Sequence, residues 1–307
     1  MLRFALLRIL SAIPTLFLVV VLAFLMVHAA PGGPFDEERV LPPENARNLA
    51  AAYHLDESLP RQFVRYASGL LRGDLGPSYH YRDHGVSELI GAGFPLSFQL
   101  ALLSMAVALA AGVAAGVFAA LRRNTISDRL ITGIAMTGIS VPVFVVAPLL
   151  VLVFAVELRW LPASWSGDAG ARRFLLPVIA LSLPQIAYIT RLMRASMIEV
   201  LSSDFVRTAR AQGLSLFSIV RFHALKPAML PVLSYLGPAI AAVLTGAVVV
   251  EMIFGVPGLG QLFLRGALNR DYTLVLGIVV FYAAAIIVLN LAVDLLYGFL
   301  DPRIRHP

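Results

Sequence analysis

The chain has 307 residues, of which 59% are hydrophobic and only 14% are charged, and its mean hydropathy is +0.84. Soluble domains carry about 25% charged residues. A water-soluble globular protein is therefore nearly excluded, and the lipid bilayer is expected to be the main solvent. The absence of cysteine excludes disulfides, thiol nucleophiles and cysteine-based metal sites.

Six apolar stretches of 17 to 27 residues follow one another along the chain. At about 1.5 Å per residue, such lengths can cross a hydrocarbon core of about 30 Å. The sequence therefore predicts an all-α polytopic membrane protein with six transmembrane helices. The predicted spans cover residues 9–29, 96–121, 131–156, 174–190, 228–253 and 274–300. The first span exceeds the core of a cleaved signal peptide, about 7 to 15 residues, so a retained anchor is favoured over cleavage.

The net charge of +6 raises the question of a nucleic-acid surface, but the placement of the basic residues indicates a membrane topology instead. Six spans put both termini on one side of the membrane. That side carries 13 Arg and Lys residues, whereas the short loops of the other side carry 5. By the positive-inside rule, both termini are expected in the cytoplasm.

The chain is expected to divide into a first span (residues 1–30), an external loop (31–95) and a five-helix core (96–307). The external loop has apolar spacings that predict short helices over residues 44–53 and 59–71. It is interpreted either as a cap over the outer mouth or as a docking surface for an external partner. His80 and His84 have the spacing of a metal pair, but their glycine- and proline-rich surroundings favour loop residues.

Several features of the spans concern packing and chemistry. Gly112 and Gly116 predict close helix contacts. Glu251 and Asp294 are the only Asp, Glu, Lys or Arg residues inside the predicted spans, which disfavours an ion-coupled carrier and an intramembrane hydrolase. Asp294 is expected to pair with an arginine at a helix end. Prolines inside spans three to five indicate bent helices that wall a cavity; they are Pro142, Pro148, Pro177, Pro184, Pro231 and Pro238.

An ATP-binding phosphate loop needs a lysine followed by serine or threonine. The single lysine, Lys226, precedes Pro227. If ATP drives this protein, the nucleotide must bind to another subunit.

The cytoplasmic loop over residues 198–226 predicts two short helices around a glycine. Ser203 or Asp204 can cap the first helix, and Ser215 can cap the second. Gly213 suits a left-handed helix end. An apolar stripe between basic flanks indicates a compact knob that packs into a soluble partner.

This loop resembles the coupling loop of the membrane-spanning subunits of binding-protein-dependent ABC importers. Residues 207–211 read RTARA before Gly213, as in the peptide-transporting branch, although Arg207 and Thr208 replace the general Glu-Ala and the later proline is displaced to Pro227. Residues 251–260 (EMIFGVPGLG) and 290–304 (NLAVDLLYGFLDPRI) are also similar to that branch, as are LPPE and GDLGPSY in the external loop. The whole chain resembles the B-type permease subunit of oligopeptide importers.

The resemblance implies a type I importer bundle in the bacterial inner membrane. This chain would be half of a pathway formed with a second related permease, two cytoplasmic ATPases and an external peptide-binding protein. No cofactor is expected in this chain, with ATP and Mg in the ATPases. The residues expected to couple to the ATPase are Asp204, Phe205, Val206, Arg207, Thr208, Ala209, Arg210, Gly213, Leu214, Ser215, Leu216 and Phe217.

Two further sets are nominated. Glu251, Pro257, Gly258 and Gly260 are expected at an outer gate, although a structural turn is an equal interpretation. Gln185 and Tyr188 are nominated for the peptide path. The alternatives for function are a self-sufficient ion-coupled carrier and, more distantly, an intramembrane hydrolase. Within the importer class, dipeptides or nickel chelates are alternative cargo.

Overall fold

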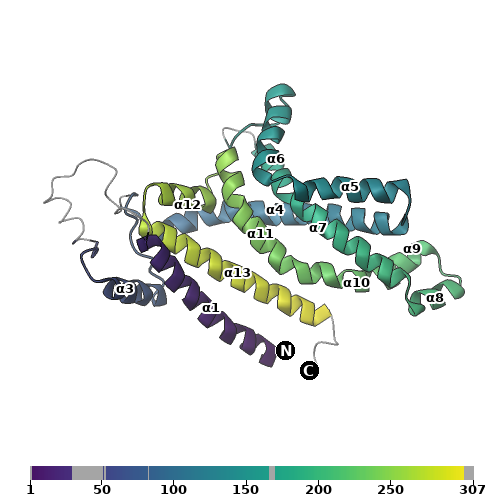
Figure 1. Ribbon diagram of the computed structural model, residues 1–307, viewed down its shortest axis with the longest axis horizontal. Coiled ribbons are helices and arrows are strands. Elements are labelled where there is room, and N and C mark those ends of the chain that lie inside the picture. The colour runs from purple at the N-terminus through teal and green to yellow at the C-terminus, as the bar shows by residue number, and fades with distance from the viewer. Residues whose placement is uncertain (1, 30–50, 52, 82, 166–169, 301–307) are drawn as a thin grey trace. The chain divides into compact units, whose positions relative to one another are not determined.

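In the computed structural model, the residues described are 2–29, 51, 53–81, 83–165 and 170–300, and most of these are helical, with no β-strand among them (Figure 1). The long helices are α1 (Leu2–Ala29), α4 (Val86–Leu121), α5 (Ile126–Ser140), α7 (Leu175–Leu201), α11 (Leu230–Phe254) and α13 (Tyr272–Leu300). The shorter elements are α3 (Leu59–Leu71), α6 (Val143–Leu150), η1 (Val151–Glu157), η2 (Gly170–Phe174), α8 (Asp204–Ala211), α9 (Leu216–Ser218), η3 (Ile219–Ala224), α10 (Leu225–Ala228) and α12 (Leu259–Leu268).

Five helices are long and apolar enough to cross a membrane, and a bent pair can supply a sixth span. This confirms the predicted set of spans, with shifted ends. α7 runs on to Leu201, beyond the predicted end at residue 190, because hydropathy marks the membrane surface rather than the helix end. The predicted helix over residues 59–71 is confirmed as α3, whereas residues 44–50 lie outside the described part of the chain.

The third predicted span is broken instead of continuous. α5 and α6 meet at Val141 and Pro142 with a bend of 103°. Pro142 has no N–H to donate, and it pushes the preceding residue out of the helical region, so that Val141 is extended (φ −98°, ψ 119°). The predicted bend at this proline is confirmed. The bend is so large that α5 and α6 are two separate helices.

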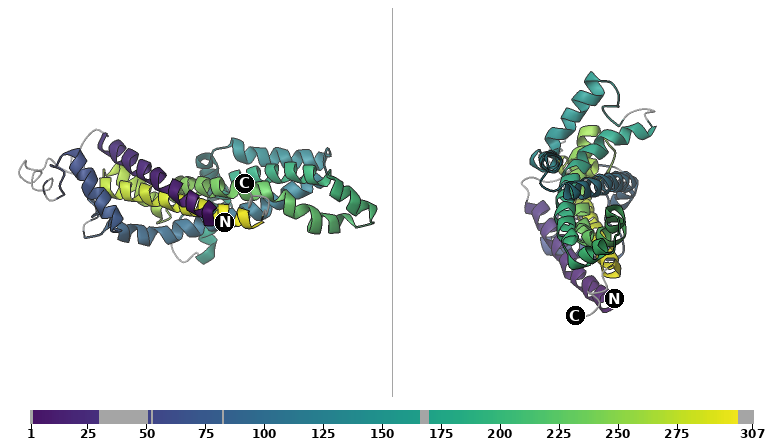
Figure 2. Two further views of the ribbon diagram at one scale, coloured as in Figure 1. Left: turned by 90° about the horizontal axis from the view of Figure 1, so that it is seen from below. Right: turned by 90° about the vertical axis from the view of Figure 1, so that its right-hand side faces the viewer.

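The chain forms two compact units, which are described in turn. The first comprises Met1–Arg8, Ser97–Val256 and Ile286–Pro307. Within it, α5, α6 and α11 pack on α7, and α8 and α9 lie beyond the ends of α7 and α11 (Figure 2). Arg8 Nε lies 3.2 Å from Asp294 Oδ2, which confirms the predicted pairing of Asp294 with an arginine. The division expected at residues 30 and 95 stays a prediction.

Gly112 and Gly116 bring α4 against α7, as predicted. A Cβ at Gly112 would lie 2.8 Å from Ile189 Cβ, and one at Gly116 would lie 2.6 Å from Met193 Cβ and 2.7 Å from the Thr190 carbonyl oxygen. No side chain fits at either position unless α4 and α7 move apart.

We expect Gly116→Ala to lower the free energy of unfolding by about 1–3 kcal/mol, because the added methyl meets the backbone of α7. Gly91, also in α4, is the matched control, since a Cβ there has nothing within 4 Å. Gly91→Ala should be neutral or stabilise by up to about 1 kcal/mol. Thermal unfolding of the two purified variants compares them, and equal midpoints would contradict the close α4–α7 contact.

The second unit comprises Ile9–Leu96 and Pro257–Ala285. Its core contains Val86, Ile90, Leu259, Leu274 and Ile278. The fully buried Asp271 ties the segment before α4 to the start of α13: its carboxylate accepts hydrogen bonds from the Ser78 hydroxyl, the His80 N–H (3.2 Å) and the Leu274 N–H (3.1 Å). A side-chain oxygen in this position satisfies an N–H of the first turn that has no partner within the helix. His80 and His84 are loop residues, as predicted, and His84 lies 3.1 Å from Glu88.

Candidate functional site

The loop after α7 forms the predicted knob, defined here as residues 202–224. Gly213 has φ +81°, and its N–H donates to the Arg210 carbonyl (2.9 Å), which closes α8 as expected. The Ser218 N–H donates to Ser215 Oγ (3.3 Å), which confirms the second cap. Ser203 holds the first cap position, but its hydroxyl donates back to the Val200 carbonyl (2.6 Å), so no side chain caps α8.

The predicted coupling residues divide between the inside and the outside of the knob. Val206 and Ala209 are buried against Ile219 and Leu201. These two residues hold the knob together and do not reach its surface. The apolar stripe read from the sequence is thus mainly the knob's own core.

The outer surface of the knob combines apolar and cationic groups. Phe217 is 72% exposed and Phe205 is 48% exposed. The Arg207 side chain lies 3.4 Å from the carboxylate of Asp204 and is well exposed. The other exposed members of the predicted set are Thr208, Arg210, Gly213, Leu214, Ser215 and Leu216. Exposed rings and guanidinium groups are typical of the centres of protein interfaces.

The knob packs on α7 and borders a pocket at the end of α4. The pocket, of about 290 Å³, is lined by Leu121 at the end of α4, Arg123 from the α4–α5 turn, Leu201 from α7, and Arg210 and Leu216 from the knob.

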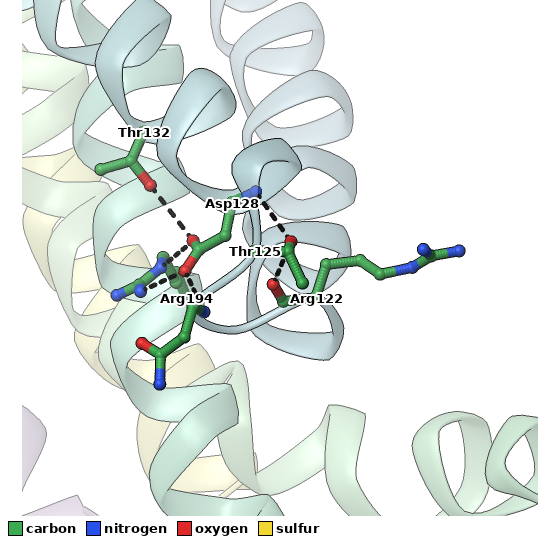
Figure 3. A network of polar contacts seen from close by, with 6 residues as sticks. Arg122, Thr125, Asp128, Thr132 and Arg194 are labelled. Atoms are coloured by element: carbon green, nitrogen blue, oxygen red, sulfur yellow. Dashed lines mark hydrogen bonds and ion pairs between the residues drawn. The ribbon is translucent and has the colours of Figure 1, made fainter.

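Next to this turn, α5 and α7 are joined by an ion pair that sequence reasoning missed (Figure 3). Arg194 Nε lies 2.6 Å from Asp128 Oδ1, and Arg194 Nη2 lies 2.8 Å from Oδ2. The Asp128 carboxylate is buried and also accepts from the Asn124 N–H (2.9 Å) and the Thr132 hydroxyl (3.5 Å). Such a bidentate contact fixes the orientation of the two side chains as well as the distance between them. Thr125 and Asp128 have the spacing of a helix cap, and this spacing was the one feature of the sequence that pointed to Asp128.

The two residues nominated for the path lie together. The Tyr235 hydroxyl of α11 donates to Gln185 Oε1 of α7 (2.9 Å), and the rings of Tyr188 and Tyr235 are 5.6 Å apart. Tyr235 was not nominated, because its partner lies 50 residues away in the sequence. These three side chains form a polar group between two helices that contain prolines, Pro184 in α7 and Pro238 in α11.

The residues nominated for a gate fall in different units. Glu251 is fully buried near the end of α11, where Gly255 adopts φ +66° and the Val256 N–H donates to the Glu251 carbonyl (2.8 Å). The Trp165 N–H donates to the Phe254 carbonyl (2.7 Å) at the same helix end. Pro257, Gly258 and Gly260 belong to the second unit, where Gly258 precedes α12. Both segments are ordered turns, and their role in a gate stays a prediction.

Comparison with known proteins finds families and individual proteins that are similar to this chain. Residues 112–306 match the family described as binding-protein-dependent transport system inner membrane component, and residues 1–101 match the N-terminal region of such components. The chain is 52% identical to the oligopeptide transport system permease protein OppB of Salmonella typhimurium, covering 100% of both chains. It is 40% identical to the dipeptide transport system permease protein DppB of Bacillus subtilis, covering 99% of this chain and 98% of that one.

A solved structure of the MetNI methionine ABC transporter, in inward-facing conformations, has a TM-score of 0.56 at 15% identity. The match covers 69% of this chain and 96% of the other, and it shows the shared fold. The two family matches and the full-length identity lead to one conclusion. The chain belongs to the family of inner-membrane components of binding-protein-dependent transport systems.

Proposed function

We propose that this chain is one of two permease subunits of an ATP-driven peptide importer, with both termini in the cytoplasm. A second related permease, two cytoplasmic ATPases that hold ATP and Mg, and an external peptide-binding protein complete the assembly. The observation that carries the proposal is the full-length identity of 52% to a permease of an oligopeptide transport system. The knob, with its exposed rings and arginines, supports the ATPase contact.

The proposed cycle uses the knob as the mechanical link. Closure of the ATPases around nucleotide displaces the knob and opens the path outward, and hydrolysis returns it. A link of this kind must be stiff. The buried Val206 and Ala209, the left-handed Gly213 and the packing of η3 on α7 and α8 meet that requirement.

The proposed path runs beside Gln185, Tyr188 and Tyr235. A peptide that leaves water needs partners for its N–H and C=O groups. The amide of Gln185 and the hydroxyls of the two tyrosines offer both donors and acceptors. Glu251, Pro257, Gly258 and Gly260 stay proposed for the gate.

Reconstitution tests the proposal. The chain is co-expressed with its neighbouring transport subunits, purified as a complex and placed in vesicles with the external binding protein. We expect labelled tripeptides to accumulate only with ATP, and ATP hydrolysis to increase when loaded binding protein is added. Accumulation by the chain alone would support an ion-coupled carrier instead. So would accumulation that continues when ATP is left out but stops when an ionophore is added.

The cargo has a second candidate, because the relative of 40% identity belongs to a dipeptide transport system. Competition by unlabelled dipeptides, pentapeptides and a nickel chelate against the labelled tripeptide separates these classes. Stronger competition by dipeptides than by pentapeptides would assign the dipeptide class.

A further inference from the structure

A cavity of about 340 Å³ lies within the second unit, and its lining includes no residue of the knob or of the polar group of α7 and α11. Its walls come from the end of α1, from α3 and the segments on either side of it, and from the start of α13. Seven aromatic side chains line it: Phe24, His28, Tyr53, His54, Tyr66, Tyr79 and Tyr272. Pockets of this size can hold part of a small ligand.

The rings form a connected set. Phe24 and His28 stack at 4.0 Å between centroids, His28 and Tyr272 are 5.5 Å apart, and Tyr53 and Tyr79 meet edge to face at 4.8 Å. The Gln62 side chain is held on the same wall: its Nε2 donates to the Leu55 (3.2 Å) and Glu57 (2.8 Å) carbonyls, and its Oε1 lies 3.2 Å from His28 Nε2. The aromatic wall is thus fixed by its own contacts.

One polar atom in this wall lacks a protein partner. The Tyr66 hydroxyl oxygen is buried, and within the described part of the chain no group is placed to hydrogen-bond with it. Burial raises the pKa of Tyr66 above its ordinary value, so the hydroxyl stays neutral and can accept a hydrogen bond. A buried, unpaired hydroxyl is costly, and a bound ligand or water is the usual remedy.

The charges around the cavity favour a cation. Arg65 is neutralised by Glu57, which it contacts through Nη2 and Oε1 (2.5 Å), and this contact holds the pKa of Glu57 below its ordinary value. Asp74 accepts a hydrogen bond from the Gly76 N–H (2.8 Å), and among the described residues no basic side chain pairs with its carboxylate. The lining therefore has one uncompensated negative charge.

We propose that this cavity binds an ammonium group of a peptide. An ammonium has three donors and no acceptor, so it suits acceptors of the kind that the Tyr66 hydroxyl and the Asp74 carboxylate offer in the lining. Aromatic walls attract such a cation through their ring faces. The apolar arm of a lysine side chain would lie against Phe24 and Leu276, which also line the cavity. The inference rests on the proposed function, which places the loop of residues 31–95 on the external side of the membrane.

The test measures binding by isothermal titration to the purified complex in nanodiscs, without ATP or binding protein. The probes are N-acetylated trilysine amide, N-acetylated trinorleucine amide, which lacks only the side-chain ammonium groups, and trinorleucine with a free N-terminus. We expect trilysine to bind and acetylated trinorleucine not to bind. Binding of the third probe would assign the N-terminal ammonium as a ligand as well.

Variants locate the site. Asp74→Asn should weaken trilysine binding by about tenfold, and Tyr66→Phe by about threefold, since each removes one acceptor and keeps the shape. Asp56→Asn is the matched control, because Asp56 is an exposed acid of the same unit that does not line the cavity. Equal binding of the two acetylated probes, no binding of trilysine, or equal loss in Asp74→Asn and Asp56→Asn would overturn the proposal. Because nucleotide is absent, a complex that binds trilysine but does not take up peptide would count against the proposed function alone.

Discussion

Replacing Gly213 with valine is expected to reduce ATP-driven peptide uptake by about tenfold or more. Gly213 closes α8 with φ +81°, and a Cβ there has nothing within 4 Å. The cost is therefore in the backbone and not in a clash. An L-residue in this conformation costs roughly 1–2 kcal/mol, and a β-branched one is worse. Since about 1.4 kcal/mol is a factor of ten in an equilibrium constant, the population of the native turn relative to non-native turns falls by about tenfold or more.

Different substitutions at Gly213 distinguish a backbone cost from a steric clash of the side chain. Asparagine tolerates positive φ better than other non-glycine residues, so Gly213→Asn should keep most of the uptake although it is larger than Gly213→Ala. Uptake that fell with side-chain volume, with asparagine below alanine, would contradict the backbone argument.

Gly73 provides the matched control for this series. It follows α3 with φ +77°, and a Cβ there also has nothing within 4 Å. Gly73→Val has the same backbone cost but lies outside the knob. We expect the ATPases to co-purify with Gly73→Val as with the parent chain, and to be retained poorly by Gly213→Val. Equal retention in both variants would show that the knob does not hold the ATPase.

Local patterns in the sequence were sufficient to predict the features that depend on residues close together along the chain. Hydropathy located the spans, the spacing over residues 59–71 predicted α3, and Gly213 and Ser215 were recognised as a helix end and a cap. Each of these features depends on residues within one or two helical turns. The bend at Pro142 was also predicted, but its angle depends on what α5 and α6 pack against.

Features that depend on distant partners could not be predicted in this way. Val206 and Ala209 were read as a docking stripe, yet Leu201 and Ile219 cover them from neighbouring segments. Tyr235 reaches Gln185 across 50 residues, and Asp128 reaches Arg194 across 66. A periodic pattern identifies an apolar face but does not indicate whether the chain itself or another protein covers it.

Removing one member of the Asp128–Arg194 pair is expected to destabilise the chain by about 3 kcal/mol. Asp128→Asn leaves the Arg194 guanidinium without its counter-charge in a contact where the Asp128 side chain is only 4% exposed. Breaking a buried pair costs about 3–5 kcal/mol, and the 28% exposure of Arg194 places the effect at the lower end. Thermal unfolding of the purified chain, or of its complex, measures the loss.

The neighbouring Asp204–Arg207 pair is the control. Its side chains are 96% and 73% exposed, and the N–O distance is 3.4 Å. Asp204→Asn should change the stability by no more than about 1 kcal/mol, because exposed pairs contribute little. Similar losses in Asp128→Asn and Asp204→Asn would show that burial of the first pair has no energetic consequence.

Two further variants separate charge from geometry. Arg194→Lys keeps the positive charge but loses the planar fork that meets both carboxylate oxygens, so we expect it to recover less than half of the lost stability. In the exchanged pair, Asp128→Arg with Arg194→Asp, the charges still match, but the Asn124 N–H and the Thr132 hydroxyl no longer face a carboxylate. The exchange should therefore remain less stable than the parent. Full recovery by either variant would mean that charge alone joins α5 to α7, and that the hydrogen-bonded geometry around Asp128 is dispensable.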